Sequence, residues 1–301
     1  MNAAANHEGL TRASATRALV TACSVAGLRS DEADLLRLGE NAIYALPHQN
    51  VVVRVARSDA GDIQEKVAKE LSVARWLSSQ GFPGIAPRED LPQPLQAEGR
   101  LVTFWEYIPP SRNEPGLTDL AMLLRELHTL PDPDFALPAL DPFPTMWRRL
   151  EQAHGVKKQD VDFLSEACSH SEAAFHDVVA QHPTGLIHGD AHRGNLLGRG
   201  DGVLLIDYEA VAVGPQGWDL LPTAIAVDRF ALPRPEYGAF CRNYGQDVTT
   251  SEGYEELRTV RELGMTTWLM QNAQSGAAAE EFAIRMESLR KEDRERHWHA
   301  L

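Results

Sequence analysis

The segment LIHGDAHRGNLLGRGDGVLLIDYEAVAVGPQGWDL, residues 186–220, decides the fold that we predict for this chain. Two apolar runs, at 196–197 and 203–206, flank the glycine-rich sequence GRGDG, a pattern typical of a β-hairpin. Asn195 comes directly before the first run and Asp207 directly after the second. Because antiparallel pairing brings the two ends of a hairpin together, we expect Asn195 and Asp207 to face one cavity.

The residue types in this segment point to phosphate chemistry. A carboxylate and an amide oxygen are hard ligands, suited to Mg²⁺ that is shared with phosphate oxygens. Asp190 lies five residues before Asn195, where it can accept a proton from a substrate hydroxyl or orient that hydroxyl. Glu209 is either a second neighbour of the metal or a structural residue, and the structural interpretation is favoured.

An alternative interpretation of the same loop is a zinc site. His188, Asp190 and His192 alternate along the chain, and histidine and aspartate are zinc ligands. That hypothesis leaves Asn195 and Asp207 without a purpose, so it is the weaker one. We expect His188 to brace the loop, whereas His192 either contacts substrate or phosphate or lies at the surface.

The residues before this segment predict a strand-rich region. The run Val51–Val55, with Arg54 within it, is typical of a strand, and a turn at 47–50 joins it to the run before it as a hairpin. Helical spacing of apolar residues and strand-like runs give the remaining elements. We expect helices at 11–28 and 62–80, and strands within 35–46, 51–55 and 101–105.

After Pro109 and Pro110 the pattern becomes helical. Residues 117–127 form an amphipathic helix whose leucines belong to the core. The acidic stretch that contains Glu252, Glu255, Glu256 and Glu262 is expected to be an exposed helix face, although it could bind a cationic substrate. The segment 280–298 predicts a charge-laced helix on the solvated surface.

The spacing His-x-Asp-x4-Asn, with an aspartate twelve residues later at a strand end, resembles the catalytic and metal loops of the aminoglycoside phosphotransferase family. That family shares its fold with protein kinases. The resemblance implies an α+β, two-lobed fold, with a β-rich lobe at 1–104 and a hinge and mainly helical lobe at 105–301. It also implies that Asp190 is the catalytic base and that Asn195 and Asp207 bind Mg²⁺. Asp219, in Trp-Asp-Leu, would be a structural aspartate that holds the loops.

The N-terminal part resembles the family's nucleotide site, and the likeness runs from about residue 35 to about 270. Arg54 stands where the family presents a lysine, or often an arginine, to the α- and β-phosphates. Glu70 stands at the place of the pairing glutamate, and Asn41 lies in a turn like the one that covers the nucleotide. ATP would lie between the lobes, with adenine held by backbone groups of a hinge that includes Phe104, Trp105, Glu106 and Tyr107.

These expectations define an ATP- and Mg²⁺-dependent O-phosphotransferase that acts on a small hydroxylated molecule. An antibiotic or other natural product is the favoured acceptor, with a sugar, choline or amino-alcohol as the alternative. A nucleotide-binding regulator without turnover is the second class of function, supported by Arg54 in place of lysine. A protein kinase is disfavoured because no Ala-Pro-Glu segment and no activation loop follow Asp207.

Composition bounds the partners. The formal net charge of −14 argues against nucleic acid and is compatible with a cationic substrate. No run approaches about 20 consecutive apolar residues, and the start of the chain does not resemble a signal peptide. The three cysteines are far apart and show no metal-binding spacing, which predicts free thiols in a reducing cytoplasm.

Overall fold

The computed structural model describes residues 10–58, 60–111 and 114–300. The chain divides into two compact units. The first comprises Met1–Pro115 and Asn195–Glu209, and the second comprises Gly116–Gly194 and Ala210–Leu301. The first unit carries an antiparallel sheet and the second is mainly helical, which confirms the predicted α+β class.

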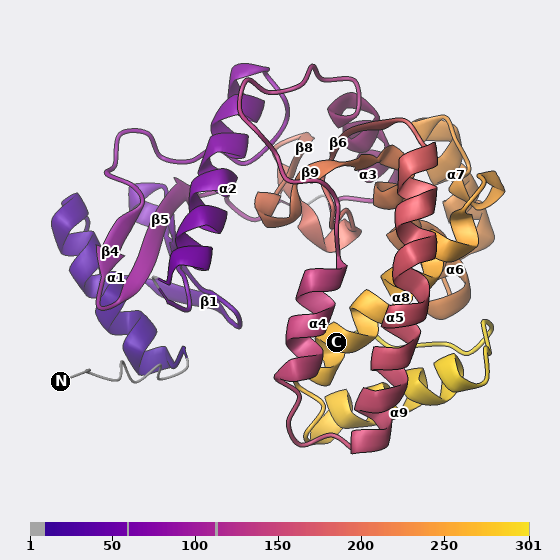
Figure 1. Ribbon diagram of the computed structural model, residues 1–301. Helices are drawn as coiled ribbons and strands as arrows, with labels where there is room; N and C mark the ends of the chain where they lie inside the picture. The colour runs from indigo at the N-terminus through magenta and orange to yellow at the C-terminus, as the bar shows by residue number, and fades with distance from the viewer. Residues whose placement is uncertain (1–9, 59, 112–113, 301) are drawn as a thin grey trace. The chain divides into compact units, whose positions relative to one another are not determined.

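The sheet of the first unit has five strands among the described residues, in the order β1-β2-β3-β5-β4, and every neighbouring pair is antiparallel (Figure 1). The predicted hairpin is confirmed, with the short 3₁₀ turn Pro47–Gln49 joining its strands. The short fourth strand was not predicted from the sequence. The strands are β1 (Asp34–Leu38), β2 (Ala42–Leu46), β3 (Val51–Val55), β4 (Leu95–Ala97) and β5 (Arg100–Glu106).

Alternation along β3 separates the two faces of this sheet. Val51, Val53 and Val55 are wholly buried in one apolar cluster, together with residues of the helix α1 (Arg12–Ala26). Because successive side chains of a strand point to opposite faces, Arg54 lies on the other face. There it meets Glu70 of the helix α2 (Gly61–Ser79), so the two helices serve different faces of the sheet.

The hairpin of β7 (Leu196–Arg199) and β8 (Gly202–Leu205) returns to the first unit from the middle of the chain. Leu205 donates its N–H to Pro83 O at 2.9 Å and accepts from Ile85 N at 3.0 Å. A Cβ atom added at Gly84 would lie only 2.1 Å from the Tyr208 hydroxyl oxygen. A glycine at this position therefore lets the hairpin approach the segment that follows α2.

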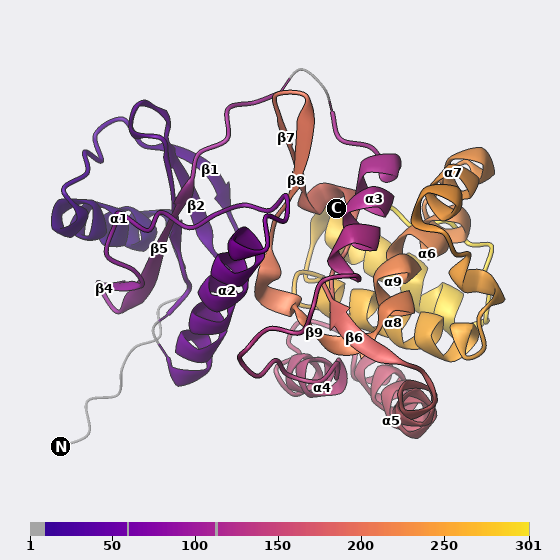
Figure 2. The same cartoon turned by 90° about the horizontal axis from the view of Figure 1, so that it is seen from above.

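The second unit is built mainly from helices, and α8 contacts α4, α5, α6 and α9 within it (Figure 2). The leucine-rich helix α3 has Leu120, Leu124 and Leu127 in the core, as predicted. Within the described residues no helix is long and apolar enough to span a membrane. The elements are α3 (Leu117–Leu127), α4 (Phe143–Glu151), α5 (Lys158–Gln181), β6 (Thr184–Ile187), β9 (Ala212–Pro215), α6 (Leu221–Arg229), α7 (Arg234–Tyr244), α8 (Tyr254–Met270) and α9 (Gly276–Arg290).

The predicted exposure of the acidic stretch is wrong for one of its residues. Glu252, Glu255 and Glu256 are exposed, but Glu262 is 5% exposed. Arg229 binds Glu262 with two hydrogen bonds of 2.8 Å, and Arg258 donates to it at 3.0 Å. Two guanidinium groups thus compensate the burial of this carboxylate, which its local sequence does not reveal.

The prediction of a solvated C-terminal helix is also wrong. Glu281, Phe282, Arg285 and Met286 of α9 are buried, because the helix packs against α8 and is covered by the segment that follows it. Trp298 in that segment is 2% exposed. Its ring lies over the Arg229 guanidinium, with 4.4 Å from the carbon to the ring centroid. The charged residues of α9 are therefore partly internal.

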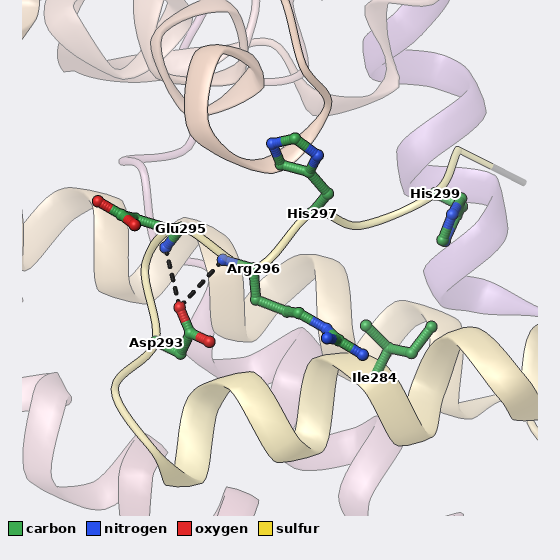
Figure 3. A pocket seen from close by; sticks show the side chains of 6 residues that line it. All are labelled: Ile284, Asp293, Glu295, Arg296, His297 and His299. Atoms are coloured by element: carbon green, nitrogen blue, oxygen red, sulfur yellow. Dashed lines mark hydrogen bonds between the residues drawn. The ribbon is translucent and has the colours of Figure 1, made fainter.

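Backbone oxygens of the same C-terminal segment bind Arg229, which donates to Asp293 O at 2.6 Å and to Arg296 O at 3.2 Å. The Asp293 carboxylate accepts from the N–H groups of Glu295 and Arg296, both at 3.1 Å, and closes the turn (Figure 3). A pocket beside this turn contains none of the residues that the sequence predicts to be functional. It is lined by Ile284, Asp293, Glu295, Arg296, His297 and His299 (Figure 3).

We expect Arg229→Met to lower the free energy of unfolding by about 3–5 kcal/mol, because it leaves the buried Glu262 with an incomplete set of partners. Urea denaturation of the purified protein measures this change. The control is Lys158→Met, since Lys158 forms an exposed pair with Asp162 on α5 and its loss is expected to cost no more than about 1 kcal/mol. Equal losses in the two variants would contradict the assignment.

Candidate active site

The loop after β6 is held from inside the second unit by one carboxylate. Asp219 is 0% exposed, and it accepts the backbone N–H of His188 at 2.6 Å and that of Gly189 at 2.8 Å. His188 is equally buried, and its Nδ1 accepts from Asp190 N at 3.4 Å. These bonds fix the backbone on which Asp190 stands.

Gly189 allows this loop to pass close to the chain that follows the hairpin. Its φ of +83° lies in the left-handed region, and an added Cβ atom would be 2.2 Å from Ala210 O. Both facts require glycine. The Gly189 carbonyl accepts from Trp218 Nε1 at 3.1 Å, so the Trp218-Asp219 pair binds both sides of the same peptide region.

Two residues that the sequence analysis missed support Asp219. His128, at the C-terminal end of α3, lies with Nε2 3.0 Å from the Asp219 carboxylate and Nδ1 2.9 Å from the Tyr244 hydroxyl. The loop is therefore connected through Asp219 to α3 and α7. A histidine directly after a leucine-rich helix is a weak signal, and it could not have been assigned to Asp219 without the fold.

Asp190 carries a carboxylate that remains 44% exposed beside two cationic or polar partners. Arg261 of α8 donates through Nη2 to Asp190 Oδ1 and through Nη1 to Gly189 O at 3.3 Å. Removal from water raises the pKa of Asp190, but the Arg261 guanidinium and His192 outweigh that effect and hold the pKa well below its usual range. The carboxylate is thus ionised at neutral pH.

His192 lies near the second oxygen of the same carboxylate. Its Nδ1 accepts from Gly194 N at 3.0 Å, which assigns the ring proton of the neutral form to Nε2. Nε2 lies 3.7 Å from Asp190 Oδ2. Among the described residues, no three His, Cys, Asp or Glu side chains form a group that could hold a metal ion, so the zinc hypothesis gains no support.

The first unit brings the two predicted magnesium ligands to the same end of the hairpin. Ile206, next to Asp207, donates its N–H to Asn195 O at 3.0 Å. Asn195 is 7% exposed, and Asp207 adopts a left-handed φ of +69°, a conformation that costs energy and recurs at functional sites. An amide and a carboxylate at one hairpin end provide the oxygen donors that Mg²⁺ prefers.

The electrostatics around Asp207 also fit a divalent cation. Burial raises the pKa of Glu70, and the Asp207 and Glu209 carboxylates raise it further against the opposing effect of Arg54. A cation bound to Asp207 would relieve the repulsion among these carboxylates. The residues present therefore match a magnesium site.

Arg54 and Glu70 form the pair that the sequence predicted. Nη1 of Arg54 lies 2.5 Å from Glu70 Oε1, and Nη2 lies 3.1 Å from Glu209 Oε2. With its amide oxygen turned to the guanidinium, Asn41 accepts from Nε at 3.1 Å and from Nη2 at 2.8 Å. Glu209 is thus a partner of Arg54, and the turn that carries Asn41 is tied to the same cation.

Two lysines of α2 complete this cluster and were missed by the sequence analysis. Lys69 donates to Glu209 O at 2.6 Å, and Lys66 Nζ lies 3.6 Å from Glu209 Oε1. Burial lowers the pKa of Lys69, against the opposing effect of nearby glutamates. Lys66 lies four residues before Glu70 and Lys69 one residue before it on the same helix. This proximity in the sequence was the signal that could have identified them as part of the nucleotide site.

The predicted hinge residues lie at the end of β5 and just after it. Phe104 is wholly buried in the core of the sheet and Trp105 is 6% exposed, so these two side chains pack inside the unit. Glu106 donates its N–H to Ala86 O at 3.0 Å, and Tyr107 donates its N–H to Asn50 O at 3.2 Å. Both are half-buried. Their contact with adenine stays a prediction.

Comparison with solved structures finds the same fold in three kinds of kinase. Amicoumacin kinase hAmiN, in complex with AMP-PNP, Ca²⁺ and Ami, is 14% identical with a TM-score of 0.66, over 91% of this chain and 92% of that one. A choline/ethanolamine kinase family protein from Mesorhizobium loti is 14% identical with a TM-score of 0.61, over 90% and 92%.

The streptomycin–ATP–APH(2″)-IIa ternary complex is 15% identical with a TM-score of 0.57, over 93% of this chain and 97% of that one. At these identities the likeness establishes the fold. A search of curated proteins gives no match.

The family is established by the sequence itself. The profile of the phosphotransferase enzyme family matches residues 39–260, which is well over half of the chain. The matched range contains both polar clusters, from Asn41 to Glu209 in the first unit and from His188 to Asp219 in the second. The chain therefore belongs to the phosphotransferase enzyme family, and it is a small-molecule kinase that transfers phosphate to a hydroxyl group.

Proposed function

We propose that the protein transfers the γ-phosphate of Mg-ATP to a hydroxyl of a cationic antibiotic or other natural product. The observation that carries this proposal is Asp190, an ionised and partly exposed carboxylate on a loop fixed by Asp219. The three free thiols of the protein, two of which are buried, suit the reducing cytoplasm, the compartment that supplies ATP.

Nucleotide binding is assigned to the Arg54 cluster. The guanidinium is oriented by Glu70 and Asn41 before any phosphate arrives, which reduces the entropy lost on binding. Lys66 and Lys69 add positive charge on the neighbouring helix. Glu209, which now accepts from Arg54, would give way to phosphate oxygens or share the guanidinium with them.

Acceptor activation is assigned to Asp190. Since its pKa lies well below the usual range, the carboxylate is a weak base but a charged hydrogen-bond acceptor. It would orient the acceptor hydroxyl and take its proton while the bond between the γ-phosphorus and the β–γ bridging oxygen breaks, ADP leaves and the new O–P bond forms. Magnesium, held by Asn195 and Asp207, would supply neutralisation of the phosphate charge.

The acceptor class is inferred from the relatives and from charge. Solved structures with this fold include an amicoumacin kinase and a streptomycin complex, which supports an antibiotic acceptor. The choline/ethanolamine kinase family protein supports a small amino-alcohol as the second candidate. The net charge of −14 favours a cation in either case. The regulator hypothesis is disfavoured because the matching family is one of phosphotransferase enzymes.

The decisive experiment is transfer of labelled γ-phosphate from Mg-ATP to a panel of aminoglycosides, amicoumacin-like antibiotics, macrolides, sugars and choline. Label on an antibiotic supports the first candidate, and label on choline alone supports the second. If the protein neither binds Mg-ATP nor hydrolyses it, the proposed function is wrong.

We expect Asp190→Asn to lower kcat for transfer by about 100- to 10,000-fold, because it removes the charged partner of the acceptor hydroxyl. ATP affinity should stay within about threefold of the unaltered protein, since Arg54, Glu70 and the hairpin are untouched. Steady-state kinetics and equilibrium titration with ATP separate the two quantities. An unchanged kcat would remove Asp190 from the reaction.

We expect Asp207→Asn to raise the Mg²⁺ concentration for half-maximal activity by at least about tenfold, which corresponds to a loss of roughly 1.4 kcal/mol in metal binding. Titration of activity with Mg²⁺ at fixed ATP measures it. Asp201→Asn, in the exposed turn of the same hairpin, is the matched control and should not change the requirement. Equal behaviour of the two variants would refute the metal assignment.

We expect Arg54→Lys to lower kcat/KM for ATP by about tenfold, the effect of losing one charged hydrogen bond of roughly 1.5 kcal/mol. A lysine has a single nitrogen and cannot hold Glu70, Asn41 and a phosphate as the guanidinium fork does. Arg57→Lys, at a half-exposed arginine paired with Glu40, is the control. A lysine variant as active as the parent would show that the fork is dispensable.

A further inference from the structure

Arg261 contacts the proposed catalytic loop from a helix that no motif connects with it. It lies on α8, 71 residues after Asp190, and donates both to the Asp190 carboxylate and, at 3.3 Å, to the carbonyl of Gly189. One rigid guanidinium thus binds the side chain of one residue and the backbone of the residue before it. This geometry restricts the rotation of the Asp190 side chain relative to its own loop.

The surroundings of Arg261 indicate that its contact with Asp190 and Gly189 sets the position of its guanidinium. Its side chain is 15% exposed, and its carbon lies 5.7 Å from the centroid of the Trp218 ring. The Nε atom is buried and has no hydrogen-bond partner among the described residues. Arg258, one turn earlier on α8, also has a buried nitrogen, Nη2, without a partner among the described residues, so what distinguishes Arg261 is its contact with Asp190 and Gly189.

Other arginines of the second unit behave differently. Arg229 makes two bonds to Glu262, and Arg258 is bound by Glu262 and Asp228 within helix-packing contacts. Arg261 instead places its charge on the carboxylate that the reaction is proposed to use. The pair Arg261–Asp190 is neutral overall, which matters because the γ-phosphate is itself anionic.

Repulsion between Asp190 and that phosphate would otherwise oppose the reaction. Like charges a few ångström apart repel one another strongly where water is partly excluded. A guanidinium fixed on Oδ1 offsets this repulsion while the carboxylate keeps its charge. It also makes the two oxygens unequal, since Oδ1 is directed to Arg261 and Oδ2 to the side of His192.

We propose that Arg261 is a positioning residue for phosphoryl transfer: it holds the Asp190 carboxylate in one rotamer through Oδ1, directs Oδ2 to the acceptor hydroxyl, and offsets repulsion of the γ-phosphate. The inference rests on the proposed function, because it assigns a role to Arg261 only if Asp190 acts on the acceptor. Arg261 itself touches neither reacting atom.

The test compares Arg261→Gln and Arg261→Lys in the full chain, with transfer to the acceptor found by the panel and hydrolysis of Mg-ATP by water as parallel readouts. We expect Arg261→Gln to lower kcat by about 100-fold, the typical cost of a misplaced catalytic group, with little change in KM for ATP. Arg261→Lys should recover part of that loss. A third variant, Arg261→Ala, should lose activity as Arg261→Gln does and should recover part of it when millimolar guanidinium is added.

Arg258→Gln is the matched control, because it removes a buried arginine from the same helix one turn earlier. It should lower thermal stability with kcat for the folded fraction nearly unchanged. Two results would overturn the inference and leave the proposed function intact. In the first, Arg261→Gln retains the kcat of the parent. In the second, Arg261→Gln loses activity only in proportion to unfolding, as Arg258→Gln does, and neither Arg261→Lys nor guanidinium added to Arg261→Ala restores activity.

Turnover by the unaltered protein and by Asp190→Asn distinguishes failure of the proposed function from failure of the inference about Arg261. If the unaltered protein shows no turnover of Mg-ATP with any acceptor or with water, the proposed function fails and the role of Arg261 fails with it. If the unaltered protein is active and Asp190→Asn is as well, the role assigned to Asp190 is wrong, and Arg261 has nothing to position.

Discussion

The buried carboxylate of Asp219 is the constraint on which the second unit's functional loop depends. A wholly buried carboxylate needs several donors, and it finds them in the backbone of His188 and Gly189 and in His128. Backbone N–H groups are fixed by chain geometry, so the loop has one arrangement that satisfies the charge. Asp190, the next residue, takes its direction from that arrangement, and Arg261 then fixes the side chain as Asp219 fixes the backbone.

In the first unit, a strand and a helix place a buried charge, that of Arg54, beside groups of opposite charge. Alternation along β3 directs Val51, Val53 and Val55 into the core and leaves Arg54, with Val52, on the other face. A buried guanidinium there requires acids, which α2 supplies through Glu70 and the end of the hairpin supplies through Glu209. The hairpin is therefore linked to the sheet by charge as well as by the close approach at Gly84. The same links hold Asp207 near the proposed phosphate site.

Local sequence was sufficient for the features that depend on local periodicity or on a linear motif. The β2–β3 hairpin, α2, the leucine face of α3 and the hairpin that ends at Asp207 all follow from spacing within a few residues. Contacts between distant helices were not predictable. Arg261 contacts Asp190 from 71 positions away, and His128 contacts Asp219 from 91 positions away. The burial of Glu262 depends in part on Arg229, which reaches it from α6. The return of 195–209 to the first unit has no local signal either.

Charge placement reconciles a strongly acidic chain with an anionic substrate. A net charge of −14 repels ATP at long range, yet salt screens that field beyond about 10 Å. What matters at the phosphates is the local arrangement, where Arg54, Lys66 and Lys69 stand among Glu70 and Glu209. Guanidinium groups match Glu70, Glu209 and Asp190, whereas His128 and two backbone N–H groups match Asp219. The cationic acceptor that we propose would be attracted by the net negative charge of the chain.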